Sequence, residues 1–204
     1  MIGRKRRDAG QAFPIYVVMV AGLLFLVFAF FAVGKAAALR NGAQGAADAA
    51  ALAAARQVRE DLESQFLAAL PERLLPVFLA GHEVSQAMPC AEAQRLASDN
   101  KADVTDCQVW PGGRRDKVRV ETESRKTVDS AVIPGSKNTR AKQHATAVIR
   151  FQCSWRSVDL NEDSVEDIYF FSCDKGGMVE IRPSSPPPWS EVSKILFDVH
   201  LVDN

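Results

Sequence analysis

The sequence has few of the residue patterns that support enzyme chemistry. It has only three histidines, His82, His144 and His200, and no serine near them lies in a G-x-S-x-G motif. It has no glycine-rich phosphate loop, because the segment PGGRRD lacks both the Lys-Ser/Thr pair and the strand-then-helix context. Nothing locates a cleft with the paired acids that a glycosidase needs. We therefore expect a protein that is not an enzyme and holds no cofactor.

The chain also has no net charge, since it contains 25 basic and 25 acidic residues. The charge is uneven, because four basic residues and one acid crowd into residues 4–8. The rest of the chain is mildly acidic and shows no basic stripe with paired aromatic residues, so nucleic acid is not an expected partner.

A metal-ligand pattern begins in one polar loop and then breaks. Asp159, Asn161 and Asp163 have the i, i+2, i+4 spacing that starts a calcium loop. Ser164 then stands where such a loop needs glycine, and Phe170 where it needs a bidentate glutamate. We expect a solvated hairpin loop here and no metal site.

One long stretch has no charge at all. The 22 residues from Phe13 to Gly34 would span about 33 Å as a helix, close to the hydrocarbon thickness of a bilayer. The alternative is a signal peptide cut near residues 36–38, but its apolar region usually has about 7–15 residues. Basic residues before the stretch place the N-terminus in the cytoplasm. We expect a cytoplasmic tip at 1–12, a transmembrane helix at 13–34 and the remainder outside the cell membrane.

The next segment is dominated by small side chains. Twelve of the twenty residues from Ala36 to Ala55 are alanine, the best helix former. They continue the membrane helix or start a second helix after Asn41-Gly42. Three of the alanines, spaced i, i+4 and i+8, lie on one side of it: Ala46, Ala50 and Ala54. Since small residues let helices approach closely, we expect these three to line a contact with a neighbouring helix.

A second apolar stripe follows the alanines in the sequence. It consists of Val58, Leu62, Phe66 and Ala69. This spacing predicts an amphipathic helix that rests on something and ends near Pro71. Together the two stripes define an Ala-rich and amphipathic helical segment at 35–80.

The remaining residues, 81–204, predict a small extracytoplasmic α+β domain with an antiparallel sheet. A short helix is expected at 90–100. The period then changes to the alternation of half-buried strands. The expected strands are VTDCQVW (104–110), KVRVET (117–122), HATAVIRFQCSW (144–155), DIYFFSC (167–173) and the closing KILFDVHLVD (194–203). The segment PGGRRD separates the first two as a turn.

Four cysteines lie on the predicted outer side, where an even number predicts two disulfides. Cys153 and Cys173 stand ten residues before and ten residues after Asp163, so a hairpin that turns at 162–163 places them opposite each other. Cys90 then pairs with Cys107 by elimination. Four buried free thiols are an alternative, and a zinc site is a weaker one because no C-x-x-C occurs.

The first sixty residues resemble the N-terminal region of Tad-type (Flp) pilus-assembly proteins of the TadE/TadG-like group. The resemblance rests on three features in order: the basic tip ending RRDAGQA, the apolar span to Gly34, and RNGAQGAADAAALAAA beyond it. The most specific piece is AADAAALA, which fixes the positions of Asp48 and Leu52. The rest of the chain is more loosely similar to TadG-related proteins of actinobacteria, through the helix before NKADVTDCQVW, the alternating strands and LFDVHLVD.

The resemblance implies an anchored structural component of a Tad-type pilus or a related secretion apparatus. Its partners would be the membrane and other pilus or secretion components, which contact the N-terminal helix around the small residues and Asp48 and Leu52. Members of the wider pilin-like group are cut after a glycine that precedes a glutamate by five residues. Gly10 would be that glycine, but Ile15 stands in the place of the glutamate. We therefore expect an accessory or minor-pilin-like protein.

A different function class is a membrane-anchored binding module. Its sheet would recognise a cell-wall polymer or a small ligand, with Trp110, Trp155 and Trp189 as contacts. Tryptophans are as readily core residues, so this interpretation is the weaker of the two.

Overall fold

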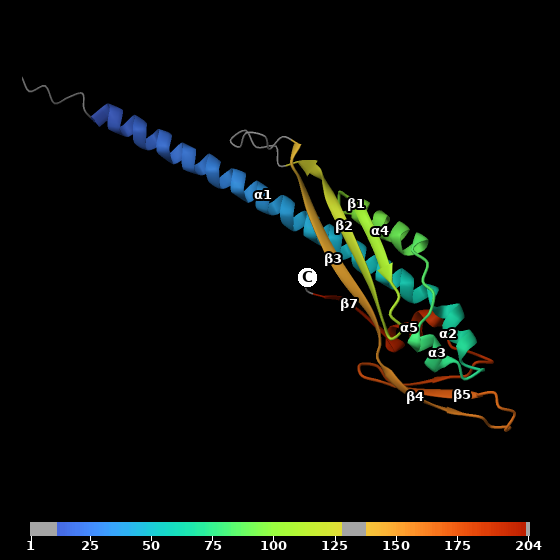
Figure 1. Cartoon of the computed structure of the whole chain (residues 1–204). Coiled ribbons are helices and arrows are strands. Elements are labelled where there is room, and N and C mark those ends of the chain that lie inside the picture. Colours follow the sequence, from blue (N-terminus) through green and yellow to red (C-terminus); the bar gives the residue numbers. More distant parts are fainter. Residues whose placement is uncertain (1–11, 128–137, 203–204) are drawn as a thin grey trace, which may run out of the picture.

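The computed structural model describes residues 12–127 and 138–202 of the chain. Its longest element is helix α1 (Ala12–Asp61), which has 50 residues and is about 75 Å long. The alanine-rich segment continues the apolar helix without a break, so no second helix starts after Asn41-Gly42. The first half of α1 protrudes from the molecule and its second half is built into the folded domain (Figure 1).

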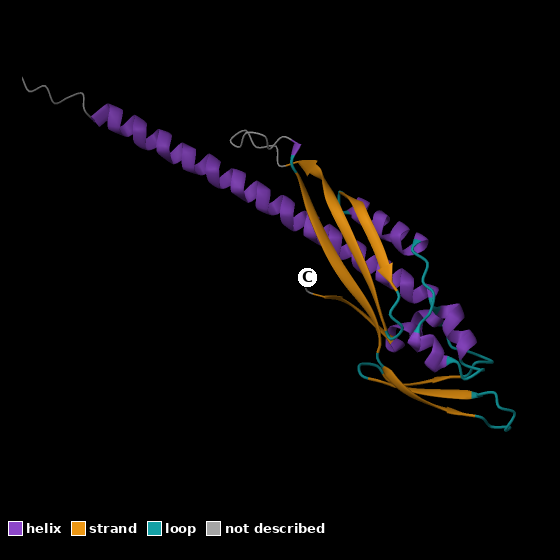
Figure 2. Ribbon diagram, viewed as in Figure 1, coloured by secondary structure: helices purple, strands orange, loops and turns teal. Residues whose placement is uncertain are grey.

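A four-stranded antiparallel sheet lies against the second half of α1. Its strand order is β1-β2-β3-β7. The strands are β1 (Ala102–Trp110), β2 (Arg115–Thr127), β3 (Arg140–Phe151) and β7 (Phe197–Val202). Helix α1 packs on β2 and β3, and α4 (Ala87–Asp99) packs on α1 and β1 (Figure 2). The two helices therefore cover one face of the sheet, as expected for the predicted α+β class.

A second, smaller antiparallel sheet lies at the end of the domain farthest from the protruding half of α1 (Figure 1). Three strands form it in the order β4-β5-β6: β4 (Cys153–Val158), β5 (Ile168–Cys173) and β6 (Gly177–Ile181). Three short helices accompany it: α2 (Glu63–Ala69), α3 (Leu75–Ala80) and α5 (Trp189–Leu196).

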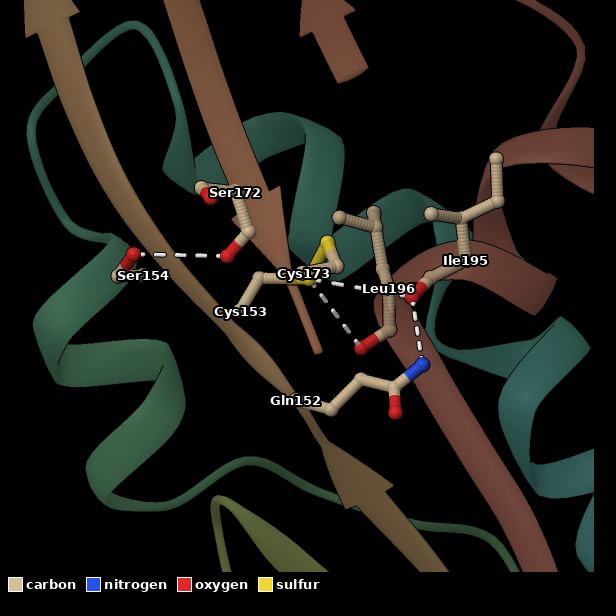
Figure 3. Close-up of a disulfide and its surroundings, with 7 residues drawn as sticks. All are labelled: Gln152, Cys153, Ser154, Ser172, Cys173, Ile195 and Leu196. Atoms are coloured by element: carbon tan, nitrogen blue, oxygen red, sulfur yellow. Dashed lines mark hydrogen bonds between the residues drawn. A yellow bond between two sulfur atoms is a disulfide. The ribbon is translucent and has the colours of Figure 1, made fainter. Parts of the chain in front are cut away.

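The chain passes from one sheet to the other at Gln152. Its backbone N–H donates to the carbonyl of Leu196 at 3.0 Å, and its side-chain Nε2 donates to the carbonyl of Ile195 at 2.9 Å (Figure 3). The single strand predicted over 144–155 was therefore wrong. The run is two strands, because Gln152 leaves the ladder of β3 and bonds to the end of α5 instead.

One aromatic cluster joins the parts of the domain. The ring of Phe66 in α2 lies 5.4–5.9 Å from four other rings, centroid to centroid. These rings belong to α3, β5, α5 and β7, and are Phe78, Phe171, Trp189 and Phe197. The same core contains the alanines of α1. It therefore runs across the division that the sequence analysis placed between residues 80 and 81.

The C-terminal part differs from the prediction of one strand over 194–203. Lys194 to Leu196 complete helix α5, and the strand begins only at Phe197. The reason is visible in the spacing of Trp189, Val192 and Leu196, which puts three buried side chains on one helical face. Strand β6 was not predicted at all.

Candidate membrane anchor and assembly surface

The protruding half of α1 exposes large apolar side chains over its whole circumference. Phe13 and Phe30 are both 76% exposed, and Leu24 is 53% exposed. Soluble monomers rarely expose contiguous apolar patches larger than a few hundred Å². Among the described residues, α1 belongs to the one helical stretch long and apolar enough to cross a membrane. Within residues 12–127 and 138–202, no other element covers these large side chains.

The second half of α1 has the opposite character. Ala46, Ala50 and Ala54 have no exposed surface, because this part of the helix packs on β2, β3 and α4. The facing elements also present small buried residues, which are Ala93 and Ala97 of α4 and Ala145 and Ala147 of β3.

The approach between helix and sheet is close enough for a side chain to reach the backbone. The Thr122 hydroxyl on β2 donates a hydrogen bond of 3.3 Å to the carbonyl of Ala43 on α1. The alanine stripe thus packs tightly against this chain's own sheet and α4, and these faces have no surface left for a neighbouring protein's helix.

Asp48 and Leu52, the two residues that distinguish the motif AADAAALA from a plain alanine run, lie at the edge of this packed face. Asp48 is half-buried, and its Oδ1 accepts a hydrogen bond of 2.8 Å from Gln44 Nε2. The same amide group donates to the carbonyl of His144 on β3 at 3.4 Å. Leu52 is half-buried against the core. Asp48 therefore holds a side chain that links α1 to the sheet.

One comparison with known proteins found a match, and the match lies on α1. The sequence model of the Flp pilus-assembly TadE/G-like family matches residues 10–57. Residues 10–57 are therefore similar to the TadE/G-like family, and we call them the Tad segment. The resemblance predicted for the first sixty residues is thereby confirmed at the level of this group. Comparison with curated proteins and with solved structures gave no match.

The Tad segment covers both halves of α1, the exposed apolar half and the buried alanine half. It ends four residues before α1 does. The match supports a role in Tad (Flp) pilus assembly. Gly10, the residue predicted for processing, lies outside the described residues.

Two disulfides strengthen the domain into which the Tad segment is built. Cys90–Cys107 joins α4 to β1, and Cys153–Cys173 joins β4 to β5 (Figure 3). In the β4–β5 hairpin, Cys153 pairs with Cys173 in register, as the symmetry about Asp163 predicts. The alternatives of four free thiols and a zinc site are wrong for this structure, because all four sulfurs are in disulfides.

A buried His–Asp pair, which the sequence analysis missed, clamps α3 to the turn between β1 and β2. His82 Nε2 lies 3.0 Å from Asp116 Oδ2, and its Nδ1 lies 3.2 Å from the carbonyl of Phe78. Burial opposes the charged imidazole, but the hydrogen bond and charge of Asp116 outweigh it and raise the pKa of His82. With both ring nitrogens occupied, His82 acts as a structural clamp rather than as a base.

The turn itself leaves no room for a side chain. Gly113 has φ +68°, and a Cβ there would lie 2.4 Å from the carbonyl oxygen of Leu79 in α3. The neighbouring Gly112 N–H donates to Asp116 Oδ1 at 2.7 Å. The predicted turn PGGRRD therefore packs directly against the end of α3.

The polar loop that imitates the start of a calcium site uses its oxygens internally. The carboxylate of Asp159 accepts the backbone N–H of Glu162 at 2.8 Å and that of Ser164 at 2.9 Å. It also lies 3.5 Å from the Arg73 guanidinium. These bonds hold the loop in its turn conformation.

The three tryptophans do not form one ligand-binding surface. Trp189 is buried and its indole N–H donates to the carbonyl of Arg59 at 3.1 Å. Trp155 of β4 packs on Phe151 at the end of β3, and the guanidinium of Arg114 lies over both rings. Trp110 ends β1. A sheet-borne binding site built from all three is excluded, because Trp189 belongs to the core.

Proposed function

We propose that this protein is an anchored structural component of a Tad-type (Flp) pilus or a related secretion apparatus. Residues 13–34 cross the cell membrane, the basic tip stays in the cytoplasm, and the disulfide-bonded domain lies outside. The observation that carries the proposal is the exposed apolar half of α1, which lies within a segment that matches the pilus-assembly family. The protein works by packing with partners rather than by catalysis.

The partners would contact the apolar half of α1 within the membrane. The alanine face cannot serve this purpose, since it is covered by the chain's own sheet and α4. The exposed residues of the apolar half remain available to lipid and to neighbouring helices, whose association in the bilayer depends on close packing. We place the protein with the TadG-related accessory or minor-pilin-like components, with an uncut N-terminus.

Photo-crosslinking in the native cell tests this assignment. A photoreactive amino acid replaces Phe28 in the apolar half, and in a matched strain replaces the exposed Met178 of β6. We expect Phe28 to crosslink to other pilus or secretion components and Met178 to give no such product. Crosslinks from Met178 alone would place the partner surface on the domain. Extraction of the whole chain by alkaline carbonate would refute the anchor.

Mass spectrometry of the N-terminus from native membranes tests the processing state. We expect the N-terminal peptide to begin at residue 1, or at residue 2 if only the initiator Met is removed. A new N-terminus at Gln11 would make the protein a processed pilin. A new N-terminus near Ala38 would make the apolar stretch a signal peptide.

A further inference from the structure

Two hollows lie at the end of the four-stranded sheet that is next to the smaller sheet (Figure 1). The first, of about 420 Å³, is lined by Trp110 at the end of β1 and by Arg115 and Lys117 of β2. The second, of about 330 Å³, is lined by Arg115 again and by side chains of β3, β7 and the β5–β6 turn. Because Arg115 borders both hollows, they form one surface, which we call the distal surface.

The strand register brings the side chains of the distal surface together. Trp110 lies opposite Lys117, and Arg115 lies opposite Arg150, which in turn lies opposite Asp198. Side chains of directly opposed residues share one face of a sheet. On β2 they alternate with buried side chains, so they lie on the face that α1 and α4 do not cover. From β1 to β7 the distal surface crosses three strand spacings, about 14 Å.

The distal surface has more cations than its one lining acid can neutralise. Lys175 donates to the carboxylate of Asp198 at 3.2 Å, and the guanidinium of Arg150 lies 3.9 Å from it. Within residues 12–127 and 138–202, Arg115 and Lys117 form no ion pair. Both are exposed. The two hollows therefore carry an excess of positive charge.

One arrangement on this surface is unfavourable for the fold. Arg115 and Arg150 are directly opposed, and like charges in that position destabilise a sheet. The Nε of Arg150 is buried and has no hydrogen-bond partner among the described residues. The nearest carboxylate is already engaged, because Lys175 and His200 Nδ1 lie 3.2 and 3.0 Å from Asp198. Local rules of stability are typically broken at functional sites. An anion bound between the two guanidinium groups would offset their repulsion.

The charges of the distal surface lie far from both ends of the described segments. Arg115 and Thr127 are the first and last residues of β2, so they lie about 40 Å apart. Strand β7 leads away from Arg150, since its last residue, Val202, lies about 13 Å from Asp198.

We propose that the distal surface binds an anionic polysaccharide. One sugar ring stacks on Trp110, which is 43% exposed. A carboxylate or phosphate group on the chain binds Arg115 and Arg150, because planar guanidinium groups match these anions. Lys117 attracts charge on a neighbouring sugar. This binding activity goes beyond the assembly role proposed above and does not depend on it.

The composition of the surface selects this ligand among other anionic polymers. Single-stranded nucleic acids stack successive bases on several aromatic side chains, and protein segments insert apolar anchors into pockets. Of the phenylalanine, tyrosine and tryptophan residues that the structure describes, only Trp110 lines the two hollows. One flat apolar ring beside several cations suits a sugar that carries charge. The length of about 14 Å suits a chain rather than a single ion.

The first test measures binding by isothermal titration calorimetry with the full chain in detergent micelles. The probes are an oligogalacturonate, whose sugars carry carboxylates, and phosphomannan, whose sugars carry phosphates. We expect at least one to bind, and their uncharged counterparts, the methyl ester and mannan, not to bind. Arg115→Gln with Arg150→Gln should weaken the binding by about tenfold or more. The proposal is overturned if neither anionic probe binds, or if the uncharged probes bind as tightly.

The matched control removes the same charge elsewhere. Arg95→Gln with Arg182→Gln changes two exposed arginines, on α4 and directly after β6. We expect this variant to bind like the unaltered chain. An equal loss in both double variants would assign the binding to general charge attraction and overturn the proposal.

Urea denaturation of the same samples separates binding from folding. Since Arg115→Gln with Arg150→Gln removes a like-charge pair, the urea midpoint should stay the same or rise. A lower midpoint together with lost binding would mean that the arginines serve the fold, and would overturn the proposal.

The second test changes the aromatic ring without touching a charge. Trp110→Ala should weaken binding of the anionic probe by about fivefold to tenfold, whereas Trp110→Phe, which keeps a flat ring, should retain most of it. Trp110 is exposed, so neither change should alter the urea midpoint. Unchanged binding by Trp110→Ala would overturn the stacking of a sugar.

Two further probes separate the polysaccharide from other anionic polymers. Polyglutamate and oligothymidylate should each bind at least about tenfold more weakly than the better anionic polysaccharide. Equal or tighter binding of polyglutamate would assign the surface to an acidic protein segment, and the same result with oligothymidylate would assign it to nucleic acid. Either result overturns the proposal. The crosslinking from Phe28 and the carbonate extraction are independent of these titrations, so failure here leaves the anchor unaffected.

Discussion

From Phe13 to Val33, α1 carries phenylalanine, leucine and valine side chains that are exposed, whereas from Ala43 to Val58 it carries mostly alanines that are buried. Hydrophobicity alone would predict the opposite, with the more apolar first half buried and the less apolar second half exposed. The difference is one of size: large apolar groups gain most from a lipid environment, while small ones let a helix backbone lie close to a sheet. If the first half lies in a membrane, as proposed, a single helix has one half in lipid and one half in a protein core, and a substitution in each half should disturb a different property.

The largest expected effect comes from placing a charge in each half. Ala50→Arg introduces a large, unpaired charge at a fully buried position, and should cost more than about 4 kcal/mol and unfold the domain. Leu24→Arg lies in the exposed half and should instead weaken membrane insertion by about 2.5–3.5 kcal/mol. Fluorescence of the buried Trp189 follows the domain, and carbonate extraction follows the anchor. Loss of both properties in either variant would contradict two independent halves.

The next effect concerns what holds α4 over the alanine face. Cys90→Ala with Cys107→Ala opens a loop with a sequence separation of 17 residues and should lower the free energy of unfolding of the domain by about 3 kcal/mol. Urea denaturation in detergent, read by Trp189 fluorescence, measures it. Because the apolar half lies outside this loop, membrane insertion should not change. An unchanged urea midpoint would show that α4 is held by packing alone.

A volume change at constant polarity gives a smaller effect. Ala50→Leu overpacks the contact of α1 with the sheet and should cost about 1–3 kcal/mol. Ala37→Leu, at an exposed position of the same helix, should leave the free energy of unfolding within about 0.5 kcal/mol of the original. Equal urea midpoints for the two variants would mean that α1 does not pack on the sheet as described.

Much of the comparison between the two halves could be predicted from sequence. An uncharged run of helical length identifies the exposed half, and the i, i+4 repeat of alanine identifies tight packing in the other. The repeat does not identify the partner, because a sheet and a second helix place the same demand on side-chain size. The sequence predicted that the alanines contact a helix of a neighbouring protein. In the structure they pack on β2, β3 and α4 of the same chain.

Contacts between residues far apart in the sequence also divide into those that could be predicted and those that could not. The Cys153–Cys173 pair followed from hairpin symmetry, since a local turn fixes the register of both strands. The change of sheet at Gln152 left no mark in the alternation of β3 and β4. His82 and Asp116 are 34 residues apart, so their pairing depends on where α3 docks.

The smallest expected effect is a pH dependence that belongs to the folded half only. The pKa of His82 is raised in the folded state above its ordinary value of 6.5, so its stabilising effect is complete below 6.5 and is lost as the pH rises through the folded pKa. The lowered pKa values of Asp103 and Asp198 affect stability only in acid, below this window. The urea midpoint should therefore fall as the pH rises from below 6.5 to above the folded pKa of His82. The variant His82→Gln should show a smaller change of urea midpoint with pH. Membrane insertion should be constant over this range, because residues 13–34 contain no Asp, Glu, His, Lys or Arg. A parallel change in insertion would show that the two halves are coupled.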